Sequence, residues 1–89
     1  MNAQNMLSGK IVDDENGNPV PGVVIQIEGT FFRLLSNEEG QFDFSDIHLK
    51  EADLSFTHIS FEKNTIHVHV PDTAVSIRLR IKNYLSEEV

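Results

Sequence analysis

Apolar and polar residues alternate along most of this chain, in short runs separated by residues that favour turns. A period of two places every second side chain on the same face, which is typical of a half-buried β-strand. No segment shows the sustained period of 3.6 residues that an amphipathic helix would need. The pattern predicts strands at residues 7–13, 23–28, 32–36, 41–46, 52–57, 64–70 and 75–81.

Each predicted strand can turn one apolar face toward a shared core. In the last strand, the polar residues Ser76, Arg78 and Arg80 fall on the opposite face and are expected in water. The side chains predicted to point inward are Leu7, Ile11, Val23, Ile25, Ile27, Phe42, Phe44, Leu54, Phe56, Ile66, Val68, Val70, Val75, Ile77, Leu79 and Ile81.

The breaks between the runs carry residues with turn chemistry. Gly17 and Gly40 can supply a positive φ, and Pro71 fits the second position of a turn over residues 70–73. Acidic residues crowd two of these loops, but their spacing does not match an EF-hand, so they indicate turns and solubility rather than calcium binding. Several short strands separated by turns predict an all-β fold, a seven-stranded Greek-key β-sandwich.

Length and charge limit the number of domains and the kinds of partner that the protein can have. A chain of 89 residues allows one domain with a thin core, and 39% apolar residues suit a globular protein. The net charge of −7 repels phosphate backbones, so we expect no nucleic-acid partner. No apolar run approaches the ~18 residues that a membrane-spanning helix needs. The first residues also lack the basic and apolar regions of a signal peptide.

His67 and His69 are candidate contact residues because they lie two positions apart on one predicted strand. Their side chains share a face and stand roughly 6–7 Å apart, which would suit a two-point metal site. That face is opposite to the one formed by Ile66, Val68 and Val70, so we expect both imidazoles in water. No third ligand can be identified on a neighbouring strand, and we therefore predict two solvated surface histidines and no metal site.

Phe31 and Phe32 are the second pair of candidate contact residues. In a strand, one of two consecutive side chains points outward, where an aromatic ring can stack on a sugar or contact a partner protein. An aromatic ring covering the end of the sandwich is the simpler interpretation. The sequence has no cysteine, no Gly-x-Ser-x-Gly motif and no phosphate-binding glycine motif. We therefore predict neither catalysis nor a cofactor.

Several motifs follow one another at intervals that resemble a known family. They are Gly9-Lys-Ile-Val-Asp13, Asn16-Gly-Asn-Pro-Val-Pro-Gly-Val23, Gly29-Thr30, Ser36-Asn-Glu-Glu-Gly-Gln-Phe42 and Leu54-Ser-Phe-Thr-His-Ile-Ser-Phe61. Together they resemble the carboxypeptidase-regulatory-like domain over roughly Leu7 to Lys82. This resemblance implies a transthyretin-like β-sandwich. The chain departs from the family in having Ser60 where a glycine is usual, and in lacking a glycine near Arg33.

The resemblance also implies a context. Such domains are similar to the N-terminal periplasmic extensions of TonB-dependent outer-membrane transporters, SusC-like ones included. The segment Leu85-Ser-Glu-Glu-Val89 resembles the approach to a TonB box. We therefore expect a non-catalytic periplasmic accessory domain whose partners are the plug and barrel of the parent receptor, TonB or other periplasmic proteins. The alternative is a glycan- or ligand-binding module attached to a cell-surface protein or peptidase.

This interpretation divides the chain into three parts. Residues 7–82 form the predicted β-sandwich. Residues 1–6 are expected to be a disordered or non-native N-terminal extension, and residues 83–89 a linker toward the TonB box. The transported substrate, the partner and the oligomeric state have no signal in the sequence.

Overall fold

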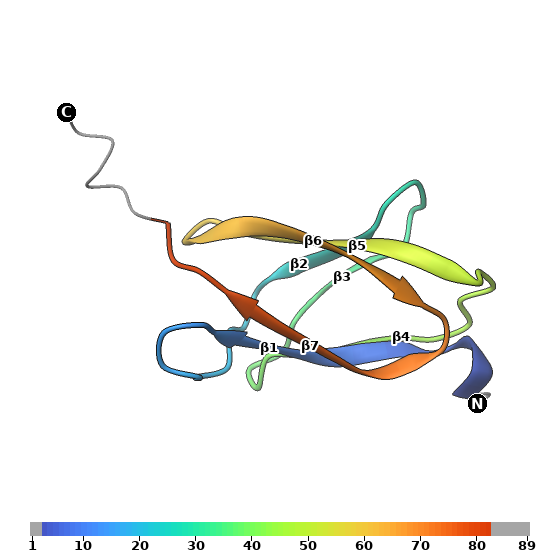
Figure 1. Cartoon of the computed structure of the whole chain (residues 1–89), viewed down its shortest axis with the longest axis horizontal. Coiled ribbons are helices and arrows are strands. Elements are labelled where there is room, and N and C mark those ends of the chain that lie inside the picture. Colours follow the sequence, from blue (N-terminus) through green and yellow to red (C-terminus); the bar gives the residue numbers. More distant parts are fainter. Residues whose placement is uncertain (1–2, 83–89) are drawn as a thin grey trace.

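The computed structural model describes residues 3–82, which fold into two packed β-sheets (Figure 1). A short 3₁₀ turn, η1, precedes the strands at Ala3–Asn5. The strands are β1 (Leu7–Asp13), β2 (Val24–Ile27), β3 (Arg33–Leu35), β4 (Gln41–Phe44), β5 (Glu51–His58), β6 (Phe61–His69) and β7 (Asp72–Leu79). The predicted all-β sandwich of seven strands is confirmed for the described part of the chain.

One sheet has the strand order β4-β1-β7 and the other has β3-β2-β5-β6. The β2–β3 and β5–β6 pairs are antiparallel hairpins, whereas β1 pairs in parallel with β7, which is distant in sequence. The chain crosses between the sheets after β1, β3, β4 and β6 (Figure 1), and the crossings give the sandwich its Greek-key connectivity.

The predicted boundaries are closest for β1 and least accurate for the last two strands. β6 starts at Phe61 rather than residue 64, because its pairing with β5 continues past a bulge to the His58–Phe61 pair. β7 starts at Asp72 rather than residue 75, because its parallel pairing with β1 begins at Leu7. These extensions are set by backbone pairing, which side-chain alternation does not report.

The core lies between the two sheets and consists mainly of the residues that alternation places inward. Phe42 packs edge-to-face against Phe44 and Phe56, with ring centroids 6.3 and 5.8 Å apart. Ile47 and Val20, in loops, complete the core from outside the strands. The prediction was wrong for Ile81, which is 51% exposed because it forms only an isolated bridge with Phe61 beyond the end of β7.

Two glycines are required by close backbone approach rather than by flexibility. A Cβ at Gly9 would overlap the carbonyl oxygen of Val75, so this residue allows β7 to pair closely with β1. Gly40 combines a positive φ of 74° with a position where a Cβ would overlap the carbonyl oxygen of Ile11. The turn at Ser60 adopts no positive φ, so serine replaces the usual glycine without backbone strain.

The segment before β1 is tied to the sandwich where the structure describes it. The backbone N–H of Ile47 donates to the carbonyl of Asn5, and the N–H of Asp72 donates to the carbonyl of Met6. Within residues 3–82, no helix is long and apolar enough to cross a membrane. The predicted linker at 83–89 lies outside the described residues.

Candidate functional site

The loop between β2 and β3 carries the two candidate phenylalanines and protrudes from the sandwich at the upper right of Figure 1. Phe31 is fully exposed, with a relative accessibility of 103%, and Phe32 is 42% exposed. Neither residue lies in a strand, since β3 begins at Arg33. The expectation that an aromatic ring here would cover the end of the sandwich was wrong for Phe31, which contacts almost nothing in the fold.

Hydrogen bonds around Thr30 fix the shape of this loop. The Thr30 hydroxyl donates to the carbonyl of Ile27 (2.8 Å) and accepts from the N–H of Phe32 (3.0 Å). The Gln26 side-chain amide donates to the Thr30 carbonyl (2.8 Å), and Gly29 supplies a positive φ. The exposed ring of Phe31 is therefore presented by an ordered turn rather than by a loose tip.

The candidate histidines lie on the outer face of the four-stranded sheet, as predicted, and both are exposed. Their ring centroids are 5.8 Å apart. The structure also places Glu51 opposite His69 and Asp53 opposite His67 on the neighbouring strand β5. Sequence reasoning missed these two carboxylates, because only the β5–β6 register brings them beside the histidines.

His67 bridges the two carboxylates. Its Nδ1 lies 2.7 Å from an Asp53 carboxylate oxygen, and its Nε2 lies 2.6 Å from a Glu51 carboxylate oxygen. Both ring nitrogens can donate at once only when the imidazole is protonated, so these hydrogen bonds favour the charged ring. They raise the pKa of His67 above 6.5, with the larger effect from Asp53 and the smaller one from Glu51. No group of three or more His, Asp or Glu side chains within residues 3–82 is arranged to hold a metal ion.

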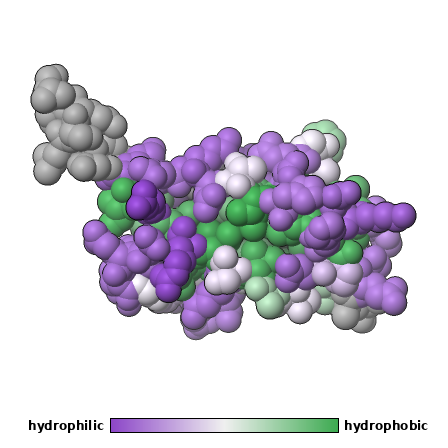
Figure 2. Space-filling view, viewed as in Figure 1, coloured by the Kyte–Doolittle hydropathy of each residue, from purple (hydrophilic) through white to green (hydrophobic). Residues whose placement is uncertain are grey.

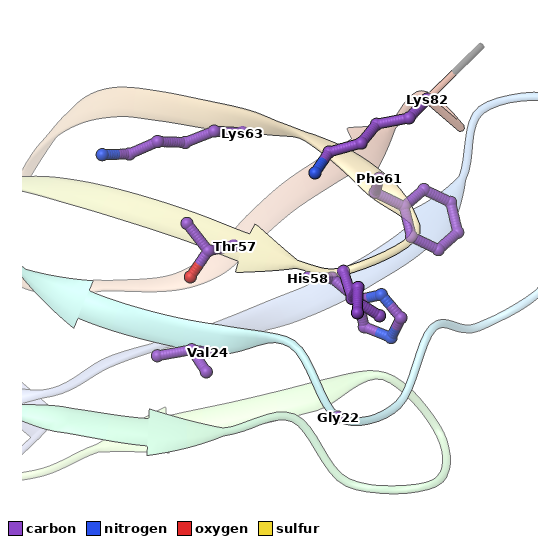
Figure 3. Close-up of a pocket in the computed structure, with 8 residues that line it drawn as sticks. Gly22, Val24, Thr57, His58, Phe61, Lys63 and Lys82 are labelled. Atoms are coloured by element: carbon purple, nitrogen blue, oxygen red, sulfur yellow. The ribbon is translucent and has the colours of Figure 1, made fainter. Parts of the chain in front are cut away.

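A shallow pocket of about 460 Å³ lies at the other end of the same sheet face, around the β5–β6 turn (Figure 3). We call it the lysine pocket. It is lined by Gly22, Val24, Thr57, His58, Ile59, Phe61, Lys63 and Lys82. Val24 and Thr57 are register partners on β2 and β5. In Figure 3, Lys82 extends back toward the β5–β6 hairpin, and Lys63 runs along β6.

The lysine pocket is lined by hydrogen-bond donors and apolar groups. The N–H of Ser60 donates to Nδ1 of His58 (3.0 Å), so the neutral ring carries its proton on Nε2. His58 also packs edge-to-face on Phe61, with ring centroids 5.2 Å apart. No signal in the sequence marks this pocket, because its lining comes from three separate segments of the chain.

Solved structures with the same fold come from proteins of different kinds. A chain of a type II cohesin–X–dockerin complex from Acetivibrio cellulolyticus matches with a TM-score of 0.68 and 17% identity. The match covers 82% of this chain and 52% of that one, so the present chain spans about half of its length. A proposed carbohydrate-binding protein from Bacteroides uniformis matches with a TM-score of 0.62 and 15% identity, over 85% of this chain and 41% of that one.

The 5-hydroxyisourate hydrolase of Klebsiella pneumoniae matches over most of both chains, 88% of this one and 92% of the other. Its TM-score is 0.65 and its identity 22%, so this likeness, like the other two, establishes the fold alone. A comparison with curated protein sequences finds no match. The model of the CarboxypepD_reg-like domain matches residues 7–89. The chain therefore belongs to the CarboxypepD_reg-like domain family.

Proposed function

We propose that this domain is a non-catalytic accessory module of a TonB-dependent outer-membrane receptor, located in the periplasm, and that it acts through protein contacts. The observation that carries the contact function is Phe31, a fully exposed aromatic ring on a loop held by hydrogen bonds. Exposing a large apolar side chain in water gains the fold nothing, whereas aromatic rings are frequent anchors at protein interfaces. The receptor context rests on the resemblance of the segment 85–89 to the approach to a TonB box.

The receptor context and the contact function are tested separately. For the context, the coding sequence beyond Val89 is read: a plug and a barrel are expected, and any other continuation contradicts the proposal. For the contact, a photo-crosslinking phenylalanine analogue replaces Phe31 in the full-length protein in intact cells. The matched control carries the same analogue at Glu38, an exposed residue of the β3–β4 loop. Crosslinks to a protein are expected from position 31, and a yield no higher than the control contradicts the contact function.

The neighbouring rings Phe31 and Phe32 also favour a second candidate, a glycan-binding module. Aromatic rings stack on sugars, and the proposed carbohydrate-binding protein from Bacteroides uniformis has the same fold. Titration of the isotope-labelled domain with oligosaccharides would test this function. If the domain binds glycans, the ring signals of Phe31 or Phe32 should shift on titration. Unchanged signals at both rings would exclude the glycan-binding function.

A further inference from the structure

The lysine pocket has a charge opposite to that of the domain around it. The chain has a net charge of −7, yet the pocket is lined by Lys63 and Lys82 and by no carboxylate. Among residues 3–82, the ion pairs within 4.0 Å involve only His67, so neither lysine side chain has a carboxylate partner there. Glu62, next to Lys63 in sequence, lines two adjacent pockets together with Arg80, and Lys63 also lines one of them. Glu62 and Lys63 nevertheless form no ion pair within 4.0 Å.

The remaining polar groups of the pocket also donate hydrogen bonds. The His58 ring carries its proton on Nε2, because Ser60 occupies Nδ1. The Thr57 hydroxyl adds a further donor on the exposed face of the sheet (Figure 3). A pocket that offers two ammonium groups, an imidazole N–H and a hydroxyl is suited to an anion rather than to a cation.

The apolar part of the pocket indicates that its ligand is more than a small anion. Ile59 is 80% exposed at the β5–β6 turn, and Val24 is half-buried on β2. The volume of about 460 Å³ has room for a few peptide side chains rather than one inorganic ion. The pocket is also open, which suits a segment lying across the sheet better than an enclosed small molecule.

We propose that the lysine pocket is a docking site for an acidic peptide segment of a partner protein. Carboxylates of the segment pair with Lys63 and Lys82, and an adjacent apolar side chain packs on Ile59 and Val24. The argument is charge complementarity on an otherwise acidic domain. This inference goes beyond the proposed function, because it concerns a different surface from Phe31 and can be tested on the domain without a receptor.

The test is a titration of the isotope-labelled 89-residue protein with the synthetic peptide acetyl-Gly-Leu-Glu-Glu-Leu-amide. The control peptide carries glutamine in place of both glutamates. We expect amide shifts centred on Thr57, Ile59 and Lys63 with the acidic peptide, weakened by added salt, and much smaller shifts with the control peptide. Equal binding of the two peptides, or no binding of either, would overturn the proposal.

Two pairs of charge-matched variants separate a specific site from general attraction. Lys63→Gln combined with Lys82→Gln should weaken the acidic peptide roughly tenfold, whereas Lys10→Gln combined with Lys50→Gln should leave its affinity within about twofold. An equal loss in both double variants would contradict a specific site. A chain ending at Lys82 is also titrated. If it binds the peptide much more tightly than the full chain, the chain's own residues 83–89 are the occupant, and the assignment to a partner is wrong.

Discussion

Ser36 is a buried hydroxyl that satisfies two backbone groups of an irregular segment. Its Oγ accepts from the N–H of Val23 (2.9 Å) and donates to the carbonyl of Val20 (2.9 Å). These residues lie between β1 and β2, where no strand pairing is available to satisfy them. The serine of the sequence motif Ser36–Phe42 therefore has a structural role at the start of the β3–β4 loop.

We predict that Ser36→Ala lowers the free energy of unfolding by about 1–3 kcal/mol, because it leaves two buried backbone groups without partners. Urea denaturation measures the change. The control is Ser76→Ala on the exposed face of β7, which should stay within about 0.5 kcal/mol. A loss at Ser36 no larger than that at Ser76 would show that water replaces the hydroxyl.

The bridging position of His67 gives a prediction in pH. Hydrogen bonds to Asp53 and Glu51 raise the pKa of His67 in the folded protein above the ordinary value of 6.5. Because folded His67 binds its proton more tightly than unfolded His67, protonation of this ring stabilises the folded protein, and the contribution is fully present below pH 6.5. It is lost as the pH rises through the pKa of His67 in the folded protein. The loss of stability in His67→Gln relative to the native chain should therefore be present at mildly acidic pH and disappear at alkaline pH.

The pKa itself is measured from the His67 ring signals in an NMR titration. The midpoint should lie above 6.5, and Asp53→Asn and Glu51→Gln should each lower it. Glu38→Gln, which removes the same charge from the β3–β4 loop, should leave it unchanged. A midpoint at or below 6.5 in the native chain would mean that the two ion pairs do not persist in solution.

The parallel pairing of β1 with β7 depends on Gly9. A Cβ at this position would overlap the carbonyl oxygen of Val75 and lie 2.7 Å from its Cβ, so the two strands would have to separate. We predict that Gly9→Ala lowers the free energy of unfolding by about 1–3 kcal/mol, the usual cost of overpacking. Chemical denaturation of Gly9→Ala is compared with that of Lys10→Ala. Because the Lys10 side chain is exposed, its removal should change the free energy of unfolding by no more than about 0.5 kcal/mol.

Alternation predicted most of the strands well because one face of each is buried, whereas β3 has no fully buried side chain. Val23, Ile25 and Ile27 are all fully buried, as their period of two indicates. The role of Gly9 could not be predicted, since a glycine within a strand is expected to weaken that strand. Its role in the close approach of β7 is visible only once the parallel pairing is known. Ser55 on β5 is buried although it falls on the polar face, because Gln26 and Thr65 flank it on both neighbouring strands.

The candidate surfaces were predicted less completely than the strands. The sequence indicated that His67 and His69 share an exposed face, but it could not place Glu51 and Asp53 beside them. Those contacts depend on a register between segments about fifteen residues apart. The lysine pocket depends on residues from three segments, so only the folded arrangement reveals it.

Considered as a whole, the domain keeps its core and its candidate contact groups apart. The core closes between the sheets, and Figure 2 shows the apolar band of that interior flanked by hydrophilic surface on both sides. The Phe31 loop, the His67 cluster and the lysine pocket lie on the β3-β2-β5-β6 side of the sandwich, and Phe61 is the one residue lining that pocket that belongs to the core. Substitutions at these surfaces, Phe61 excepted, should therefore change binding without unfolding the domain.

Two phenylalanines test this separation directly. Phe31 is fully exposed, so Phe31→Ala removes no buried area, and the free energy of unfolding should change by no more than about 0.5 kcal/mol. Phe56 is fully buried against Phe42, and Phe56→Ala should cost about 3–5 kcal/mol, a large share of the stability of a domain this size. Urea denaturation of the two variants gives both values. A loss above about 1 kcal/mol for Phe31→Ala would show that this ring packs on the domain in solution, and the contact function would then lose the observation that carries it.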